Sequence, residues 1–113
     1  MRRISLYITP ATIFICLALL AFPSGLRAQG DAAKVYKTNC ALCHSADGSG
    51  DSASGKALKA KDLRSPEVQG RSDAELAEGI TKGKGKMPAF GQKLSADVIK
   101  SLVAYTRELP KKK

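Results

Sequence analysis

The residues with the clearest chemical potential are Cys40, Cys43 and His44, in the run Cys-Ala-Leu-Cys-His. On a helical turn, residues three positions apart lie on one face, so both thiols can reach the two vinyl groups on one edge of a porphyrin. The next residue, a histidine, then lies under the ring with a nitrogen directed at the iron. This spacing is the attachment pattern of c-type haem. The sequence therefore predicts one covalently bound haem at these residues.

Two other uses of such a cysteine pair compete with haem attachment: a redox-active dithiol, and one half of a zinc site. A zinc site needs two further ligands, and from residue 29 onward the sequence contains no other Cys or His. A thioredoxin-like dithiol needs a strand before the motif and alternating strands and helices after it. No such pattern is visible, so haem attachment is the favoured interpretation and the dithiol is the weaker alternative.

A haem iron held by one histidine has a second axial position, and the sequence offers one candidate for it. His44 is the only histidine, so ligation by two histidines within one chain is impossible. With Met1 in the leader, Met87 is the only remaining methionine, in the glycine-flanked run 83–91. A single methionine can also fill a gap in a core. The Lys, Gly and Pro neighbours predict a loop, which favours Met87 as the distal ligand.

The N-terminal 28 residues have the pattern of a secretory signal peptide. Arg2 and Arg3 form a basic start, residues 11–22 are an unbroken apolar or small run, and Ala28 is a plausible last residue before cleavage. The sequence therefore divides into a signal peptide, 1–28, and a domain, 29–113. We expect the domain to be exported to a periplasmic or other extracytoplasmic space.

An uncleaved membrane anchor is the alternative to a signal peptide. Leu26 occupies the −3 position, where a small residue is preferred, and residues 4–26 carry no charge over a length that can span a bilayer. Contact with a membrane is expected only in this case.

The composition of residues 29–113 limits the partners of the domain. Removing the three leader arginines from 19 basic residues leaves 16 against 10 acidic residues, a formal charge of +6. Arginines and aromatic residues are not interleaved, so nucleic acid is not an expected partner. A protein with an acidic face is expected instead. About 85 residues make a marginal core, to which a buried prosthetic group would add.

The helical signals predict a small all-α domain. Residues 32–39 are expected to form a helix that runs into the cysteine motif. Ser72 and Glu75 form a capping box for a second helix, which ends at Gly83. A third helix is expected over 96–109.

Weaker signals lie between the first two helices. Residues 45–55 are small, polar and glycine-rich, and predict a loop. A helical turn is expected at 56–63, and Pro66 suits the first position of another.

Together these residues resemble a small monohaem class I c-type cytochrome, over essentially all of residues 29–113. The run 40–44 matches the haem-binding motif, and 87–90, Met-Pro-Ala-Phe, resembles the distal methionine loop. Residues 35–36 and 102–105 resemble the apolar positions through which the terminal helices of the family cross. The resemblance implies an all-α cytochrome c fold with crossing N- and C-terminal helices, and about three to five helices around one haem c.

The resemblance also implies roles for individual residues. Cys40 and Cys43 would form thioethers to the haem, His44 would be the proximal iron ligand and Met87 the distal ligand. Two positions depart from the family pattern. Ala32 stands where a glycine is frequent, which predicts a slightly wider helix crossing. Ala53 or a neighbour stands where a proline carbonyl usually accepts the other N–H of the proximal histidine.

A haem with both axial positions filled predicts outer-sphere transfer of single electrons and no enzymatic activity. Lysines near the methionine loop predict transient docking to acidic-faced redox proteins by a monomeric carrier. These lysines are Lys82, Lys84, Lys86 and Lys93. One alternative is a haem relay subunit of a larger dehydrogenase or oxidase complex. Another is an open-site haem enzyme or ligand sensor, which requires that Met87 does not bind the iron.

Overall fold

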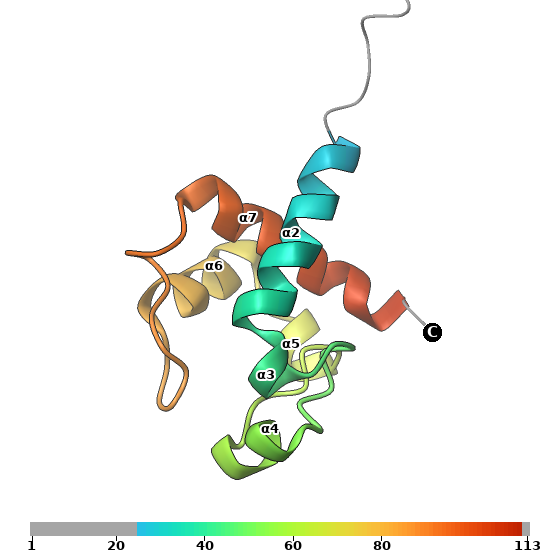
Figure 1. Cartoon of the computed structure of the whole chain (residues 1–113), viewed down its shortest axis with the longest axis vertical. Helices are drawn as coiled ribbons and strands as arrows, with labels where there is room; N and C mark the ends of the chain where they lie inside the picture. The colour runs from blue at the N-terminus through green and yellow to red at the C-terminus, as the bar shows by residue number, and fades with distance from the viewer. Residues whose placement is uncertain (1–24, 112–113) are drawn as a thin grey trace, which may run out of the picture.

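The computed structural model describes the backbone of residues 25–111 and the side chains of residues 31–111. Six α-helices lie within this part of the chain, with one 3-10 turn at its end (Figure 1). They are α2 (Gly25–Asn39), α3 (Ala41–His44), α4 (Ala53–Leu58), α5 (Pro66–Gln69), α6 (Asp73–Lys82), α7 (Ala96–Glu108) and η1 (Leu109–Lys111). No strand occurs among these residues, so the predicted all-α class is confirmed. The six α-helices exceed the expected number because α3 and α5 are single turns of four residues.

The crossing of α2 and α7 forms the centre of the core (Figure 1). Tyr36 from α2 packs with Leu102 from α7 and with Leu109 from the start of η1, and all three are buried. The rings of Tyr36 and Tyr105 lie 5.0 Å apart between centroids and are tilted by 43°. The predicted contact between the N- and C-terminal helices of the domain is therefore confirmed.

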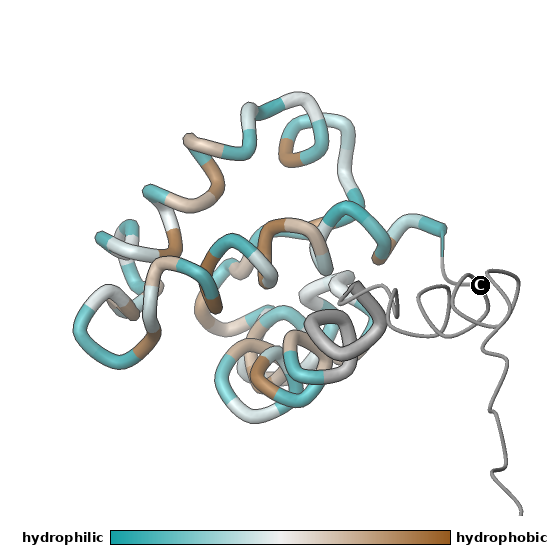
Figure 2. Tube along the Cα trace, turned by 90° about the horizontal axis from the view of Figure 1, so that it is seen from above, coloured by the Kyte–Doolittle hydropathy of each residue, from teal (hydrophilic) through white to brown (hydrophobic). Residues whose placement is uncertain are grey.

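The helices are amphipathic, as such a crossing requires. Figure 2 shows hydrophobic and hydrophilic residues following one another along the helical turns of the chain, as expected for elements that bury one face. Ala32 is buried at the contact of α2 with α7, and a groove of about 190 Å³ lies beside it. Val35 and Val98 line this groove from the two helices. Small and β-branched residues therefore line the groove beside the crossing, whereas Tyr36 and Leu102 form its buried contact.

Arg107 connects α7 to the junction of α5 and α6. Its guanidinium donates to the carbonyl oxygen of Gln69 at 2.7 Å and to the carboxylate of Asp73 at 2.8 Å. The capping box predicted from Ser72 and Glu75 is present at the start of α6. These bonds fix the start of α6 against α7. The loop that follows α6 contains Met87.

Two helix starts differ from the sequence-based expectation. α2 begins at Gly25 instead of residue 32, through Leu, Arg, Ala and Gln residues of good helix propensity. α4 covers residues 53–58, inside and beyond the stretch predicted as loop, because the Ser52 hydroxyl accepts a hydrogen bond from the Gly55 N–H and starts the helix. It ends at Lys59, whose φ of 55° is left-handed.

Residues 1–24 lie outside the described residues, so the predicted signal peptide and the alternative anchor over residues 4–26 stay predictions. Ala28, the predicted cleavage position, lies within α2. Among the described residues, no helix has both the length and the apolar character needed to cross a membrane.

We expect Gly55→Ala to destabilise the fold. A Cβ at this buried position of α4 would overlap the carbonyl oxygens of Cys43 and Gly50. Because backbone atoms cannot move aside cheaply, the expected cost is about 1–3 kcal/mol. Thermal unfolding should show a Tm lower by roughly 4–8 °C for each kcal/mol.

Gly79→Ala is the matched control for that substitution. Gly79 also lies inside a helix, α6, but a Cβ there meets nothing within 4 Å. Its replacement should raise stability by about 0.5–1 kcal/mol through helix propensity alone. Equal Tm changes in the two variants would contradict the close approach at Gly55.

Candidate functional site

The cysteine motif lies on one helical turn. Cys40 is the residue that precedes α3, and its carbonyl accepts hydrogen bonds from the N–H groups of Cys43 at 3.2 Å and His44 at 2.9 Å. Both cysteines are free thiols and half-buried. The structure thus brings the three predicted residues onto one turn, as their spacing requires.

The surroundings of Cys40 suit an uncharged sulfur. Cys40 packs against the core cluster of Tyr36, Leu102 and Leu109. Burial raises the pKa of its thiol to about 11, so the thiolate is disfavoured at neutral pH. A thioether is neutral at every pH, and it would retain these apolar contacts.

The imidazole of His44 has one nitrogen occupied. Nδ1 lies 2.9 Å from the carbonyl oxygen of Lys61. Because a carbonyl only accepts, Nδ1 donates this hydrogen bond. In a neutral imidazole with this tautomer, Nε2 carries the lone pair that can bind a metal. The expected carbonyl was that of Ala53 or a neighbour. Lys61, three residues after the end of α4, supplies it instead.

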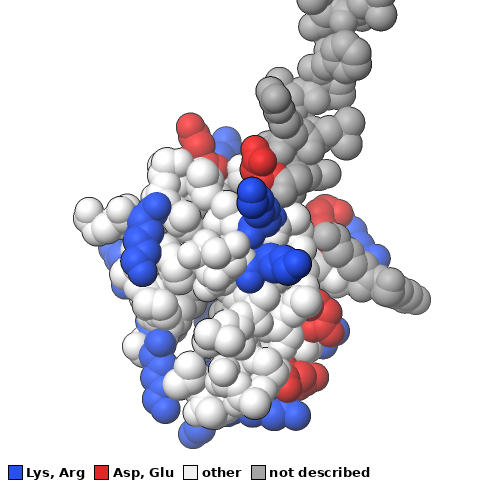
Figure 3. All heavy atoms as spheres, viewed as in Figure 1, with Lys and Arg blue, Asp and Glu red and all other residues white. Residues whose placement is uncertain are grey.

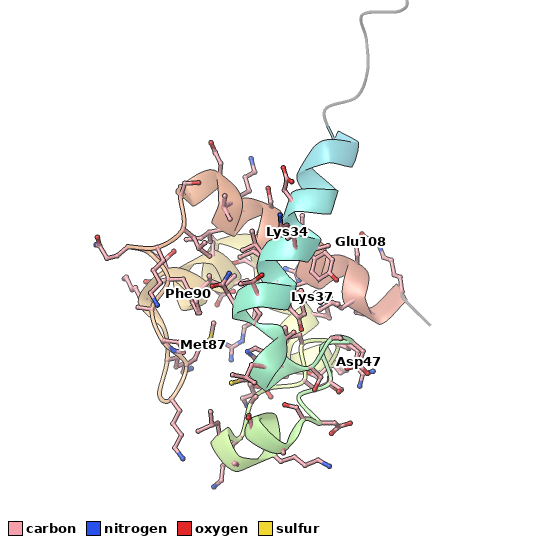
Figure 4. The ribbon with its side chains drawn as sticks, viewed as in Figure 1. Lys34, Lys37, Asp47, Met87, Phe90 and Glu108 are labelled. Carbon is pink, nitrogen blue, oxygen red and sulfur yellow. The ribbon has the colours of Figure 1, made fainter. Side chains whose placement is uncertain are left out.

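Met87 lies on a closed loop between α6 and α7. Lys84 and Met87 exchange two backbone hydrogen bonds, of 3.1 and 3.0 Å, around a turn in which Gly85 has a φ of 57°. The N–H of Phe90 then donates to the carbonyl of Ile80 at 3.0 Å, which joins the far end of the loop to α6. In Figure 4, Met87 lies on the inner side of this loop, toward α2 and α3.

Gly83 allows the loop to fold back on itself. Its φ is 70°, and a Cβ there would lie 2.8 Å from the carbonyl carbon of Pro88 and from the nitrogen of Ala89. The backbone of the segment after Met87 therefore packs directly against Gly83. This contact places the methionine.

The four predicted residues fit a covalently bound haem. Two free thiols come from one turn, an imidazole with a free Nε2 follows on the same turn, and a thioether side chain lies on a loop opposite. Within residues 25–111, no group of three or more His, Cys, Asp and Glu side chains is arranged to hold a metal ion. The zinc interpretation therefore has no ligand set in this part of the chain.

Basic side chains gather beside this site. In Figure 3, Lys and Arg residues lie along the left and lower margins, on the side of the Met87 loop and α4, and other basic residues lie in the middle of the view, over α2, and at the right. Acidic residues in this view lie at the top and right. Within residues 31–111, Lys84, Lys86 and Lys93 form no ion pair, whereas Lys82 pairs with Glu78.

Sequence reasoning missed two contributors to the site. No sequence pattern identifies Lys61 as the partner of His44, because every residue has a backbone carbonyl. Which carbonyl lies beside the imidazole is set by the path of the chain. Ser52 could be found in part from the sequence, because a serine before a short helix-compatible segment is a typical N-cap. Its hydrogen bond to the Leu42 carbonyl of α3 could not, because that bond depends on tertiary contact.

Comparison with known proteins shows a consistent relationship. A family model described as "Cytochrome C oxidase, cbb3-type, subunit III" matches residues 27–105. Cytochrome c6 of Leptolyngbya boryana is 39% identical over 80 residues, which cover 70% of this chain and 89% of that protein. The cbb3-type cytochrome c oxidase subunit FixP of Azorhizobium caulinodans is 34% identical over 91 residues, 79% of this chain but 30% of FixP. Among solved structures, the KustC0563 c-type cytochrome aligns with a TM-score of 0.64 and 31% identity, over 69% of this chain and 95% of that one.

We expect Gly83→Ala to loosen the Met87 loop. The added methyl group would collide with the backbone at Pro88 and Ala89. Amide hydrogen exchange at Met87, whose N–H bonds to the Lys84 carbonyl, should accelerate about tenfold or more, as the loss of roughly 1.4 kcal/mol implies.

Gly85→Ala is the control within the same loop. Gly85 also has a positive φ, but a Cβ there meets nothing within 4 Å, so only the left-handed backbone costs energy, about 1–2 kcal/mol. That strain acts on the turn itself. If Gly83→Ala left the hydrogen bond from Phe90 to Ile80 as well protected as Gly85→Ala does, the packing argument would be wrong.

Proposed function

This chain belongs to the small class I c-type cytochromes, which makes it a haem c electron-transfer protein and not an enzyme, and we propose that it is an exported carrier of single electrons. In this proposal Cys40 and Cys43 hold one haem c through thioethers. His44 and Met87 would bind its iron.

One observation carries this proposal. The hydrogen bond between His44 Nδ1 and the carbonyl of Lys61 leaves Nε2 as the free ring nitrogen, on the same turn as two free thiols. A carbonyl partner of this kind orients a ligating imidazole and raises its basicity. A histidine serving only as packing would need no such arrangement beside two cysteines.

The residues of this chain then set the properties of the centre. When bound, a haem supplies an iron that alternates between the ferrous and ferric states. A thioether from Met87 is a weak donor and favours the ferrous state, which raises the reduction potential. The packing of Cys40 against the core cluster keeps one edge of the site apolar.

The surface beside the site suits a short-lived complex with an acidic redox protein. Leu42 on α3 is 73% exposed and Leu58 on α4 is 40% exposed, which provides apolar contact area. Lys56 and Lys59 lie on or next to α4, and further lysines lie on the Met87 loop. An apolar centre with a charged rim is the arrangement of transient protein interfaces.

Two relationships favour a second role, as a relay within a larger complex. The family model is that of a cbb3-type oxidase subunit, and FixP is similar over 30% of its own length. In such a role the same domain would pass electrons inside an assembly. Purification as a monomer supports the free carrier, whereas stable association with an oxidase or dehydrogenase supports the relay.

Export is the third part of the proposal. The basic and apolar pattern of residues 1–28 supports it, with removal of this segment near Ala28. Cytochromes c6 align with the domain that follows.

We expect the purified protein to carry one haem that stays attached after denaturation, on a chain beginning near Gln29. Mass spectrometry measures both properties. Replacement of both Cys40 and Cys43 by Ala should abolish covalent attachment. Haem-free wild-type protein from cells competent in haem c attachment would refute the proposal.

The axial role of Met87 has a separate test. Met87→Ala should open one iron position, so that carbon monoxide binds the ferrous variant at neutral pH and the absorption band of the methionine–iron bond is lost. Lys86→Gln changes the adjacent residue without removing a thioether and should keep the band. Rapid carbon monoxide binding to the wild type would show that Met87 is not a ligand.

We expect the triple variant of Lys84, Lys86 and Lys93 to Gln to slow electron transfer to an acidic partner at low ionic strength. The expected decrease is about tenfold or more, because steering by unpaired charges acts over about 10 Å in 0.1 M salt. Stopped-flow rates at low and high salt measure the effect.

Lys111→Gln is the control for charge alone. Lys111 pairs with Glu108 at the C-terminal end, which Figure 1 shows on the side opposite the Met87 loop. Its replacement should change the rate little. Wild-type rates that do not depend on salt would exclude electrostatic steering.

A further inference from the structure

Helix α3 is too short to provide hydrogen-bond donors for its own backbone carbonyls. It has four residues, and the last four carbonyls of any helix lack partners within that helix. An isolated turn of this length is also unstable in water. The conformation of the turn that contains Cys43 and His44 therefore depends on donors from outside it.

The donors for these four carbonyls can be named. Ser45 N–H donates to the carbonyl of Ala41 at 2.9 Å, and Gly50 N–H donates to that of His44 at 2.8 Å. The Ser52 hydroxyl donates to the carbonyl of Leu42 at 2.8 Å, with the carbonyl of Cys43 at 3.4 Å. Two of the four carbonyls thus depend on one side chain.

The same hydroxyl also starts the next helix. Ser52 Oγ accepts from the N–H of Gly55 at 2.9 Å, as the N-cap of α4. One oxygen therefore joins the end of α3 to the beginning of α4. Because a hydroxyl has one proton and two lone pairs, it can make both bonds at once.

Ser45 adds a second connection. Its φ of 65° and ψ of 161° lie in a region that residues other than glycine avoid. Its carbonyl accepts from the Tyr36 hydroxyl at 2.7 Å, and its Oγ accepts from the N–H of Ser52 at 3.0 Å. These bonds hold the strained turn directly after His44.

We propose that Ser52 is a positioning residue for the axial histidine: its hydroxyl fixes the carbonyl end of α3 and thereby the orientation of His44, with Ser45 and Tyr36 as its support. This inference rests on the proposed ligation of iron by His44. If α3 were held less firmly, water would enter beside the haem and stabilise the more highly charged ferric iron. By holding α3 in place, the Ser52 hydroxyl therefore favours the ferrous state of the iron.

The test uses haem-loaded protein and two variants of Ser52. Ser52→Ala removes the hydrogen bonding to the carbonyls of α3 and also the bond accepted from the Gly55 N–H. Ser52→Asp keeps an acceptor for the Gly55 N–H, and so keeps the cap of α4, but cannot donate to Leu42. Both variants should lower the ferrous-to-ferric ratio at a fixed ambient potential by about three- to tenfold, the range that one hydrogen bond implies. Both should also change the pattern of haem methyl proton shifts in the ferric protein, which reports the orientation of the histidine ring.

Two control variants separate the positioning effect of Ser52 from the effect of an added charge and from a general loss of stability. Ala53→Asp adds the same charge at the adjacent exposed residue. Ser95→Ala removes an N-cap bond, to the N–H of Val98, at the start of the distant helix α7. Ser95→Ala should lower Tm and leave the methyl pattern unchanged.

The outcomes are distinguishable. A Ser52→Asp variant with the methyl pattern of the wild type and the ferrous-to-ferric ratio of Ala53→Asp would overturn the positioning role. A wild-type protein without covalent haem would instead refute the proposed function.

Discussion

A single helical turn, α3, holds the chemically important residues of this chain, and a turn of four residues cannot maintain its own shape. The segment from Ser45 to Lys61 therefore wraps around it. Gly50 and Ser52 occupy its free carbonyls, and the carbonyl of Lys61 accepts from His44. The absence of a side chain at Gly55 lets α4 approach this turn closely enough for these bonds to form. The rest of the site depends on this contact.

The opposite side of the site depends on a second fixed turn. Gly83 and Gly85 take backbone conformations with positive φ, which let the loop after α6 fold back on itself. Hydrogen bonds from this loop to α6 hold its far end, and Arg107 joins the start of α6 to α7. The crossing of α2 and α7 thus connects both sides of the site through one core. A ligand between them would be held by elements far apart in sequence.

Much of the fold could be predicted from local signals. The capping box at Ser72, the cap at Ser95 and the apolar positions around Tyr36 and Leu102 act over three or four residues, so they are visible in the sequence. The start of α4 at Ala53 was missed. Its small, polar residues have no helical periodicity, and the helix is stabilised by a serine cap and by packing of Gly55 against α3.

The sequence alone determined the chemistry of the candidate site, because residue type and spacing decide what Cys40, Cys43 and His44 can do on one turn, and because Met87 has no competitor after the leader. Only the tertiary structure decided how these residues are held. Lys61 accepts from His44 through its backbone, and Ser52 acts across two helices. Neither role depends on a local pattern, since each arises where distant segments meet.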